Sequence, residues 1–314
     1  MHPLLSVITV TWNGRRYVDE CVRSLNQASE IPSEVIVVDN NSSDGTPELI
    51  ESSFPNFTVI RNASNLGFSK ANNIGIAMSC GRYLCLINSD VVLPPHCLDR
   101  LFRFMEANPD VAVAGPQMRG PNDEIRRSSM RLPTLTNAFC RAIALDRIPF
   151  LSKLLGGQMM SDFQHDATAD VEVLNGWFWV IRREALGQVG LLDERFFMYG
   201  EDMDWCLRFR DAGWRVVLVA DACALHYGGA SSSVAPVRFY IEMHRANLQY
   251  WQKHHGRAKT VMYAAILLVH HLVRLVGHSL AYLAFAGRRT QLAGKIKRNS
   301  ALMGFLIGIH TALP

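Results

Sequence analysis

The stretch Tyr83–Leu93 reads YLCLINSDVVL, and it sets three polar residues at the end of an apolar run. The apolar part predicts a strand at Arg82–Ile87 that is buried on both faces, which is typical of a parallel sheet. Asn88-Ser89-Asp90 then ends that strand before apolar residues resume. Ligands of open parallel sheets bind beyond the carboxyl ends of the strands. The stretch therefore predicts a core strand and a ligand-binding edge at one place in the chain.

Apolar strands and amphipathic helices alternate on both sides of this stretch. Further strands are expected at Leu5–Thr11, Glu34–Val38, Phe57–Arg61, Val111–Gly115 and Trp214–Val219, and helices at residues 17–25, from Thr46-Pro47, and at Ser69–Ser79, Cys97–Ala107 and Met203–Ala212. Strands and helices that alternate at this spacing predict an α/β fold with a doubly wound, mostly parallel sheet.

Two more polar clusters follow predicted strands, Thr11-Trp12-Asn13 and Asp39-Asn40-Asn41. Any one such cluster can be a turn or a helix cap. Three clusters on one edge of a sheet favour a ligand site. The chain has neither G-x-x-x-x-G-K-[ST] nor G-x-G-x-x-G, which excludes the P-loop and the dinucleotide fingerprint.

Charge is distributed unevenly along the 314 residues. Residues 243–314 contain ten Lys or Arg and no Asp or Glu, a formal charge of +10, whereas residues 1–242 carry −6. Such asymmetry predicts an anionic partner for the C-terminal segment. Nucleic acid and an anionic membrane surface are the rival partners. We expect the membrane and no nucleic acid, because the segment also carries a long apolar helix.

That helix is expected at Val261–Phe285. His270, Arg274 and His278 form a polar stripe along it, which argues against a simple transmembrane span. The opposite face carries Leu268, Leu272, Val276 and Leu283, and the flanking basic residues are Arg288, Arg289, Lys295, Lys297 and Arg298. The pattern predicts a helix that lies in the membrane interface. The alternative is a helical hairpin that packs on the body of the protein or on a second subunit of a homodimer.

The seven cysteines include no C-x-x-C pair, and several lie in apolar patterns, so we expect them to be reduced. The N-terminal stretch MHPLLSVITVTWNG lacks the basic region and the long apolar core of a signal peptide. The expected location is therefore the cytoplasm, peripheral to the inner face of the cell membrane.

The order of six motifs, VITVTWNG, VVDNNSSDGT, NLGFSKANNIGI, LINSD, MYGEDMDWCLR and HYGG, resembles the family 2 glycosyltransferases. The closer likeness is to bacterial rhamnosyltransferase-type members that build cell-surface polysaccharides, and it covers roughly Leu5 to Ser233. It implies a GT-A glycosyltransferase domain at residues 1–235, with a nucleotide-sugar half at 1–116 and an acceptor and catalytic half at 117–235. A basic helical extension at 236–314 would follow.

The implied activity is metal-dependent, inverting sugar transfer, with dTDP-rhamnose as the expected donor. A hydroxyl of a lipid-linked or growing cell-surface glycan would be the acceptor. The alternative in another class is a catalytically silent subunit that binds a nucleotide sugar within a membrane polysaccharide assembly.

The resemblance also implies a nucleotide-sugar pocket. Asp39 would accept a hydrogen bond from the pyrimidine N3–H, and Gly67 would let the backbone approach the ligand. Lys70 is the least specific member, because it could equally be a solvated helix lysine. The other implied pocket residues are Thr11, Asn13, Asn65, Asn72, Asn88 and Ser89.

Asn88-Ser89-Asp90 matches the D-x-D motif of the family, which holds a divalent cation on the donor diphosphate. Asp90 and His226 would be the ligands of Mg²⁺ or Mn²⁺. Asn88 replaces the first acidic residue of the motif, which removes one charge and makes a ribose contact the alternative role. The segment from Gly228 to Ser233 is expected to form a flexible loop that closes over the donor.

Gly200-Glu201-Asp202-Met203-Asp204 opens a predicted helix, where acidic residues are favoured by the helix dipole in any case. The resemblance assigns the general base to Asp202, with Glu201 orienting the acceptor or Asp202. Asp204 is expected to pair with Arg208, four residues on. Trp177 is a candidate platform for a sugar ring, and the arginines at 126–131 could meet a lipid diphosphate or simply face water.

Overall fold

The computed structural model of the protein describes residues 3–25, 27–143, 145, 157, 158, 160, 163–228 and 235–312. The chain forms two compact units. Unit 1 consists of Met1–Leu132 and Asp162–Val234, and unit 2 consists of Pro133–Ser161 and Ala235–Pro314. Unit 2 thus contains the expected C-terminal extension and also residues 133–161.

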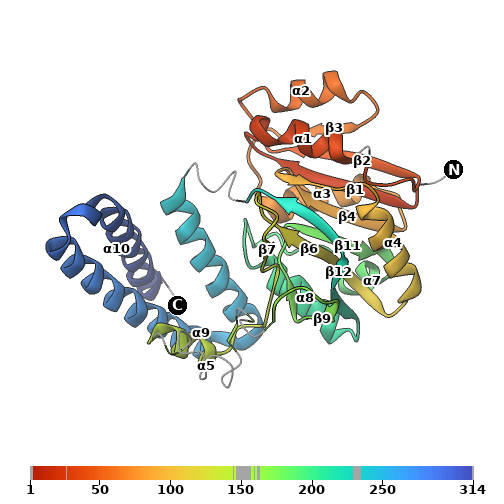
Figure 1. Ribbon diagram of the computed structural model, residues 1–314. Coiled ribbons are helices and arrows are strands. Elements are labelled where there is room, and N and C mark those ends of the chain that lie inside the picture. Colours follow the sequence, from red (N-terminus) through yellow and green to blue (C-terminus); the bar gives the residue numbers. More distant parts are fainter. Residues whose placement is uncertain are drawn as a thin grey trace. The chain divides into compact units, whose positions relative to one another are not determined.

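Unit 1 is an α/β structure built on one large sheet (Figure 1). Its main strands are β1 (Leu5–Thr11), β2 (Ser33–Asp39), β3 (Thr58–Arg61), β4 (Tyr83–Asn88), β5 (Val91–Val92), β6 (Val111–Arg119), β11 (Phe178–Arg182) and β12 (Arg215–His226). The remaining short strands are β7 (Ile125–Arg126), β8 (Ser129–Met130), β9 (Ala169–Asp170) and β10 (Val173–Leu174). The helices are α1 (Arg15–Leu25), α2 (Thr46–Ser53), α3 (Phe68–Met78), α4 (Cys97–Ala107), α7 (Arg183–Val189) and α8 (Glu201–Asp211).

The strand order of the sheet is β3-β2-β1-β4-β11-β6-β12-β5. Strands β1 to β4 pair in parallel, β12 pairs in parallel with β6, and β11 runs antiparallel between β4 and β6. Thr11 lies opposite Asp39, and Val10 lies opposite Asn88. The polar ends of β1, β2 and β4 therefore meet at one edge, as expected from the sequence.

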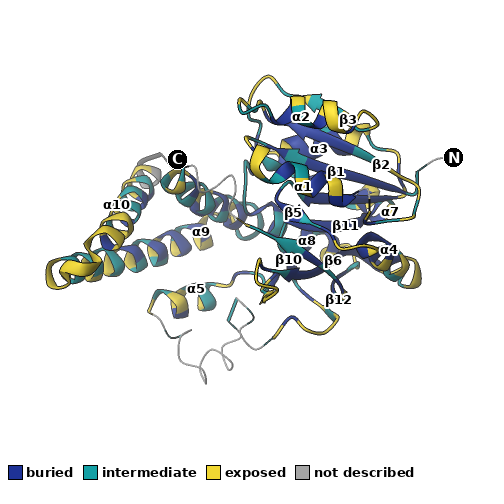
Figure 2. Ribbon diagram, turned by 45° about the horizontal axis from the view of Figure 1, so that its top comes forward, coloured by how far each residue is buried: buried dark blue, intermediate teal, exposed yellow. Residues whose placement is uncertain are grey.

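Helices cover both faces of this sheet. Val37 of β2 packs with Val18 and Val22 of α1 and with Ile50 of α2. Its neighbour Val38 points the other way, toward α3, which contacts β1 and β2. Successive side chains of a strand alternate between faces, so the sheet is doubly wound. Figure 2 shows the strands as the most deeply buried part of the unit.

Strand β12 extends well beyond its expected end at Val219. It continues to His226 after a register shift between Val219 and Cys223. The expectation placed His226 after the strand, whereas it lies in the strand and pairs with Val91 of β5. The irregularity at residues 220–222 interrupts the periodic pattern of apolar residues. The sequence pattern therefore did not predict the second half of the strand.

Unit 2 is helical, with α5 (Leu135–Ala142), α9 (Pro236–Ala284), the 3-10 turn η3 (Ala286–Arg288) and α10 (Arg289–Ala312). The expected helix at Val261–Phe285 is the second half of α9. Gly256 has φ 75° and ψ 174°, so it interrupts the helical path. Both α5 and α10 pack against α9.

The second half of α9 turns its apolar face outward. His271 is 1% exposed, whereas Leu280 is 62% and Leu283 is 72% exposed. His270, Arg274 and His278 are half-buried. The predicted polar stripe is therefore only partly covered within unit 2, and several apolar side chains of the same half of α9 are exposed. Figure 2 shows exposed positions along α9.

Candidate active site

Two buried side-chain oxygens lie side by side at the carboxyl ends of β1 and β2. Thr11 is 1% exposed and Asp39 is 2% exposed, and the two residues are register partners. Thr11 Oγ1 and Asp39 Oδ1 have no hydrogen-bond partner among the described residues. A buried polar atom without a partner is costly, so this pair is suited to a ligand that donates hydrogen bonds.

The loop after β2 is held by the other predicted residues of this edge. Asp39 Oδ2 accepts a hydrogen bond from Ser42 N at 2.9 Å. Asn13 Oδ1 accepts from Ser43 N at 2.8 Å, while Asn13 N donates to Ser42 Oγ at 2.8 Å. Asn13 thus braces the loop that follows β2, and its own side chain is exposed.

Asn40 ties this loop to the start of α3. Its Nδ2 donates to Gly67 O at 3.0 Å, and its Oδ1 accepts from Asn62 Nδ2 at 2.9 Å. Asn65 Oδ1 accepts from Gly67 N at 3.0 Å. The local sequence around Asn40 does not predict this role, because its partner Gly67 lies 27 residues away.

Gly67 is required by the backbone at this turn. Its φ is 83°, and a Cβ there would overlap Phe197 O. Asn72, by contrast, is a buried brace whose Nδ2 donates to Phe68 O at 2.9 Å. Lys70 is half exposed and lies 3.9 Å from Glu194 Oε2. Gly67 and Asn72 therefore shape the turn, and Lys70 projects from it.

The polar end of β4 meets β12. Asp90 is 6% exposed, and its Oδ1 lies 3.2 Å from His226 Nε2. Tyr227 N also donates to Asp90 O at 3.1 Å. Asn88 and Ser89 are half-buried beside this pair. An additional side chain at Gly14 would lie 3.5 Å from Ser89 Oγ and 2.6 Å from Thr11 Oγ1, so Ser89 and Thr11 flank the same glycine.

Trp177 lies under His226. The two rings stack with centroids 5.2 Å apart and an interplanar angle of 15°. Trp177 is 3% exposed, and its backbone O accepts from Asn88 N at 2.9 Å. The indole is therefore not an open platform for a sugar in this structure, because His226 and the core cover it. It fixes the plane of the His226 ring instead.

Glu201 and Asp202 begin α8 near the same residues. Burial raises the pKa of the Asp202 carboxyl to about 6, although Met203 N–H and Gly176 N–H donate to it and oppose that rise. Burial and then the charge of Asp202 raise the pKa of Glu201 well above its usual value. Glu201 is 6% exposed, and its Oε2 has no partner among the described residues. A carboxylate with a pKa near neutrality can take up a proton.

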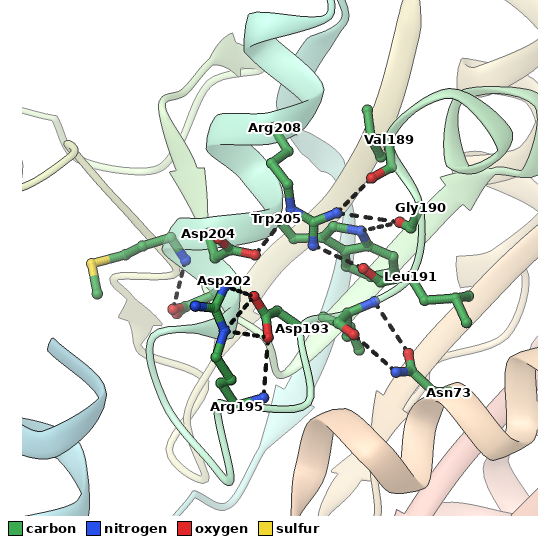
Figure 3. A network of polar contacts seen from close by, with 12 residues as sticks. Asn73, Val189, Gly190, Leu191, Asp193, Arg195, Asp202, Asp204, Trp205 and Arg208 are labelled. Carbon is green, nitrogen blue, oxygen red and sulfur yellow. Dashed lines mark hydrogen bonds and ion pairs between the residues drawn. The ribbon is translucent and has the colours of Figure 1, made fainter. Parts of the chain in front are cut away.

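A polar network holds the start of α8 against the turn that follows α7 (Figure 3). The predicted Asp204–Arg208 ion pair is present at 3.0 Å, and Asp204 is fully buried. Arg208 also donates to Val189 O at 2.7 Å and to Leu191 O at 2.9 Å. Asn73 of α3 exchanges hydrogen bonds with the backbone of Leu192.

Short links connect these residues along one edge of the sheet. Thr11 pairs with Asp39, Asn88 bonds to Trp177, and Trp177 stacks on His226, which contacts Asp90. Gly176, next to Trp177, donates to Asp202. The sequence motifs thus converge through their strands and turns. Two more buried oxygens here that the sequence did not single out, Ser69 Oγ and Asn175 Oδ1, lack partners among the described residues.

The donor set at Asp90 and His226 fits a divalent cation only with help from a ligand. One carboxylate oxygen and one imidazole nitrogen meet there. The described residues contain no group of three His, Cys, Asp or Glu side chains arranged for a metal. A hard cation commonly binds to one or two carboxylates and to substrate phosphates, so the remaining ligands would be phosphate oxygens. Residues 229–233, where a closing loop was expected, lie outside the described residues.

Sequence comparison finds relatives over most of the chain. The model of glycosyl transferase family 2 matches residues 6–190. An N-acetylglucosaminyl-diphospho-decaprenol L-rhamnosyltransferase from Mycobacterium tuberculosis is 28% identical over 271 residues, which cover 82% of this chain and 86% of the relative.

Solved structures share the fold at low identity. A mannosyltransferase from Pyrobaculum calidifontis, in complex with GDP-Man and Mn²⁺, aligns with a TM-score of 0.55 at 15% identity, over 96% of this chain and 87% of its own. GalNAc-T7 with UDP, GalNAc and Mn²⁺ aligns with a TM-score of 0.54 at 15% identity, over 78% of this chain and 47% of its own. The mixed, mostly parallel sheet of unit 1 is thus of the GT-A type.

Proposed function

Because the chain belongs to glycosyl transferase family 2, we propose that it transfers L-rhamnose from dTDP-rhamnose to a hydroxyl of a lipid-linked or growing cell-surface glycan. The proposal for donor and acceptor is supported by the relative that is named as a rhamnosyltransferase acting on an N-acetylglucosaminyl-diphospho lipid. The observation that supports the proposal is that Asp39 and Asp90 lie at strand ends on one edge of the sheet, with Asp202 connected to them through Gly176, Trp177 and His226.

The nucleotide would bind at the ends of β1 and β2. Asp39 Oδ1 lacks a partner among the described residues and can accept the pyrimidine N3–H, and Thr11 Oγ1 lies beside it. The turn at Gly67 has no side chain to keep a phosphate or ribose away from the backbone. Asn88 and Ser89 lie between this pocket and Asp90.

Asp90 and His226 would hold Mg²⁺ or Mn²⁺ together with the donor diphosphate. When bound, the cation neutralises the charge that develops on the leaving diphosphate. Trp177 keeps the His226 ring in the orientation in which Nε2 points toward Asp90.

Asp202 would act as the general base. The acceptor oxygen attacks the anomeric carbon, the bond from that carbon to the diphosphate breaks, and the hydroxyl proton passes to the Asp202 carboxylate. Attack opposite the leaving group inverts the anomeric configuration. Glu201 is buried beside Asp202, and the charge of Asp202 raises the pKa of Glu201, so Glu201 keeps its proton when Asp202 has lost its own.

Unit 2 would keep the enzyme at the inner face of the cell membrane. The second half of α9 exposes apolar side chains, and residues 243–314 are strongly basic. Both properties suit a membrane interface that is rich in anionic lipid. Among the described residues, one helix, Pro236–Ala284, is long and apolar enough to cross a membrane by length and composition, but its half-buried polar stripe favours a position in the interface. A homodimer that covers the same face is the competing arrangement.

The test is thermal-shift titration of the full-length protein with dTDP-rhamnose and with UDP-sugars, with and without Mg²⁺ or Mn²⁺. We expect a shift that requires both dTDP-rhamnose and cation, and transfer of rhamnose to an N-acetylglucosaminyl-diphospho-prenol. Asp90→Asn should remove the cation-dependent part of the shift, whereas Asp221→Asn, an exposed carboxylate on the same β12 as His226, should not. If a UDP-sugar stabilises the protein and dTDP-rhamnose does not, the donor is a UDP-sugar and not dTDP-rhamnose. Transfer that does not depend on cation would reject the metal site.

A further inference from the structure

Three histidines of α9 cluster inside unit 2. His244 is 7% exposed and His271 is 1% exposed, and their ring centroids are 5.0 Å apart. His270 lies 4.9 Å from His271. In a straight helix, residues 244 and 271 would be about 40 Å apart at ~1.5 Å per residue. The non-helical Gly256 lets the two halves of α9 fold together, so the cluster exists because of the break.

The ring nitrogens of this cluster are incompletely used. Neither His244 Nδ1 nor His244 Nε2 has a partner within the parts of the chain that the structure describes, and His271 Nε2 has none there either. His271 Nδ1 pairs with Asn299 Oδ1 at 2.7 Å, and His270 Nδ1 lies 3.2 Å from Ala142 O. Buried nitrogens without partners are costly, and three of them in one place indicate a missing ligand.

Cationic groups surround the histidines. Burial, followed by the charges of His271 and Arg141, lowers the pKa of His244 to about 3. Burial and then Arg274 lower the pKa of His270 to about 4. Arg298 lies over the Tyr240 ring at 5.2 Å, and Tyr240 packs against His244.

Acidic side chains do not balance these charges. No Asp or Glu follows Glu242 in the sequence. Arg274 and Arg298 are half-buried, and no ion pair to either is found in the described part of unit 2. The arginines would repel a metal cation here, and the described residues contain no group of three His, Cys, Asp or Glu side chains that could hold one. An anion would neutralise the arginines and accept a hydrogen bond from His244, because His271 and His270 already donate their Nδ1–H to Asn299 Oδ1 and Ala142 O.

We propose that this basic cluster binds a phosphate ester, namely the diphosphate of the lipid-linked acceptor; the cluster consists of His244, His270, His271, Arg141, Arg274 and Arg298. The inference rests on the proposed function for the identity of the ester. Arginine forks match phosphate oxygens in geometry and charge. The exposed apolar side of α9 carries Leu272 and Val276, so the same helix can meet the lipid that holds the acceptor's prenyl chain.

The same chemistry could come from a phospholipid headgroup, and the experiment separates the two sources. Full-length protein is titrated with farnesyl diphosphate, with farnesol, and with phosphatidylglycerol vesicles. The test variant is Arg274→Gln/Arg298→Gln. The matched control is Arg257→Gln/Lys259→Gln, which removes the same charge from exposed positions of α9.

We expect the test variant to bind farnesyl diphosphate at least tenfold more weakly than the wild type, and the control variant to bind within twofold of it. The single variant Arg298→Lys keeps the positive charge, so it should bind farnesyl diphosphate more tightly than the double variant does. A selective loss of vesicle binding with intact farnesyl diphosphate binding would assign the cluster to headgroups and reject the acceptor. Equal losses in both variants, or equal binding of farnesol, would overturn the site.

Donor binding is measured on the same samples. A test variant that keeps its thermal shift with nucleotide sugar and the helical circular dichroism of the wild type is folded in both units, so a lost farnesyl diphosphate interaction then belongs to the cluster. Failure of the proposed donor or acceptor would appear in the transfer assay, while failure of the cluster would appear only in the diphosphate titration.

Discussion

Asp202 and Glu201 are adjacent carboxyls, and burial opposes the ionisation of both. An acid whose pKa is raised on folding binds its proton more tightly in the folded state, so it is protonated, and inactive as a base, up to the raised value. Because the pKa of Asp202 is about 6, we expect kcat/KM to rise about tenfold per pH unit below that pH and to level off above it. The measurement is a pH profile of rhamnosyl transfer at limiting donor.

The control for this profile lies on the same helix. Asp202→Asn should lower kcat by a factor on the order of 10² to 10⁴ without loss of donor binding, whereas exposed Asp211→Asn should leave both unchanged. A profile that is flat between pH 5 and 7, or an active Asp202→Asn enzyme, would move the base to another residue. The like charge of Asp202 raises the pKa of Glu201, so Glu201 is still neutral where Asp202 titrates, and Glu201→Gln should leave the acid limb near pH 6.

Individual residues were predictable from the sequence where a strand end carried them. Asp39 and Asp90 follow apolar runs that can only be buried strands, and both lie where that placement requires. The local sequence did not predict the buried, structural positions of Trp177 and Asn72. An aromatic or amide side chain occurs in similar sequence patterns whether it packs in the core or lines a binding site. The roles of Asn40 and Ser69 depend on packing between distant turns, which no local pattern encodes.

At the scale of elements, the orientation of α8 depends on one buried ion pair. Arg208 neutralises Asp204 and donates to two carbonyls of the turn after α7 (Figure 3). Arg208→Ala would leave Asp204 without this ion pair and two carbonyls without donors. Breaking a buried pair from one side costs about 3–5 kcal/mol. Since Arg208 is partly exposed, we expect the free energy of unfolding to fall by about 2–3 kcal/mol.

Chemical denaturation with a tryptophan fluorescence readout measures this cost, because Trp205 on the same helix is buried and donates to Gly190 O. Arg210→Ala is the matched control, since Arg210 is exposed on α8, and its cost should stay within ~0.5 kcal/mol. An equal effect of the two substitutions would show that the network does not stabilise the start of α8.

Elements were predictable where their pattern was regular. From β1 to β4, strands and helices alternate regularly along the chain. The bounds of β1, β2 and β4 lie within one or two residues of the expected ones. The second half of β12 is hidden by its register shift. The fold-back of α9 at Gly256 is also hidden, because a lone glycine within a helical pattern does not reveal whether the helix continues.

The whole molecule combines an acidic N-terminal part with a basic C-terminal segment that exposes apolar side chains. Val273, Val276, Leu280 and Leu283 are each more than half exposed on α9. Exposed apolar patches of this kind mark interaction surfaces. A negatively charged bilayer would attract the basic residues of the same unit and would also bury the exposed apolar side chains. Nucleic acid would bind the basic residues only and would leave the apolar side chains exposed to water.

The apolar contribution is tested by Leu280→Asp/Leu283→Asp in the full-length protein. Burying a leucine is worth about 1.5–3 kcal/mol, so we expect binding to phosphatidylglycerol vesicles in a sedimentation assay to weaken at least tenfold. Met78→Asp, which changes a similarly exposed apolar residue in unit 1, should bind like the wild type, and donor-induced thermal shifts should survive in both. Added salt should weaken the residual binding of the double variant, because its basic residues remain. Undiminished vesicle binding of the double variant would show that these leucines do not contact the bilayer, and a change from dimer to monomer in analytical ultracentrifugation would show that a second copy of the chain covers this face.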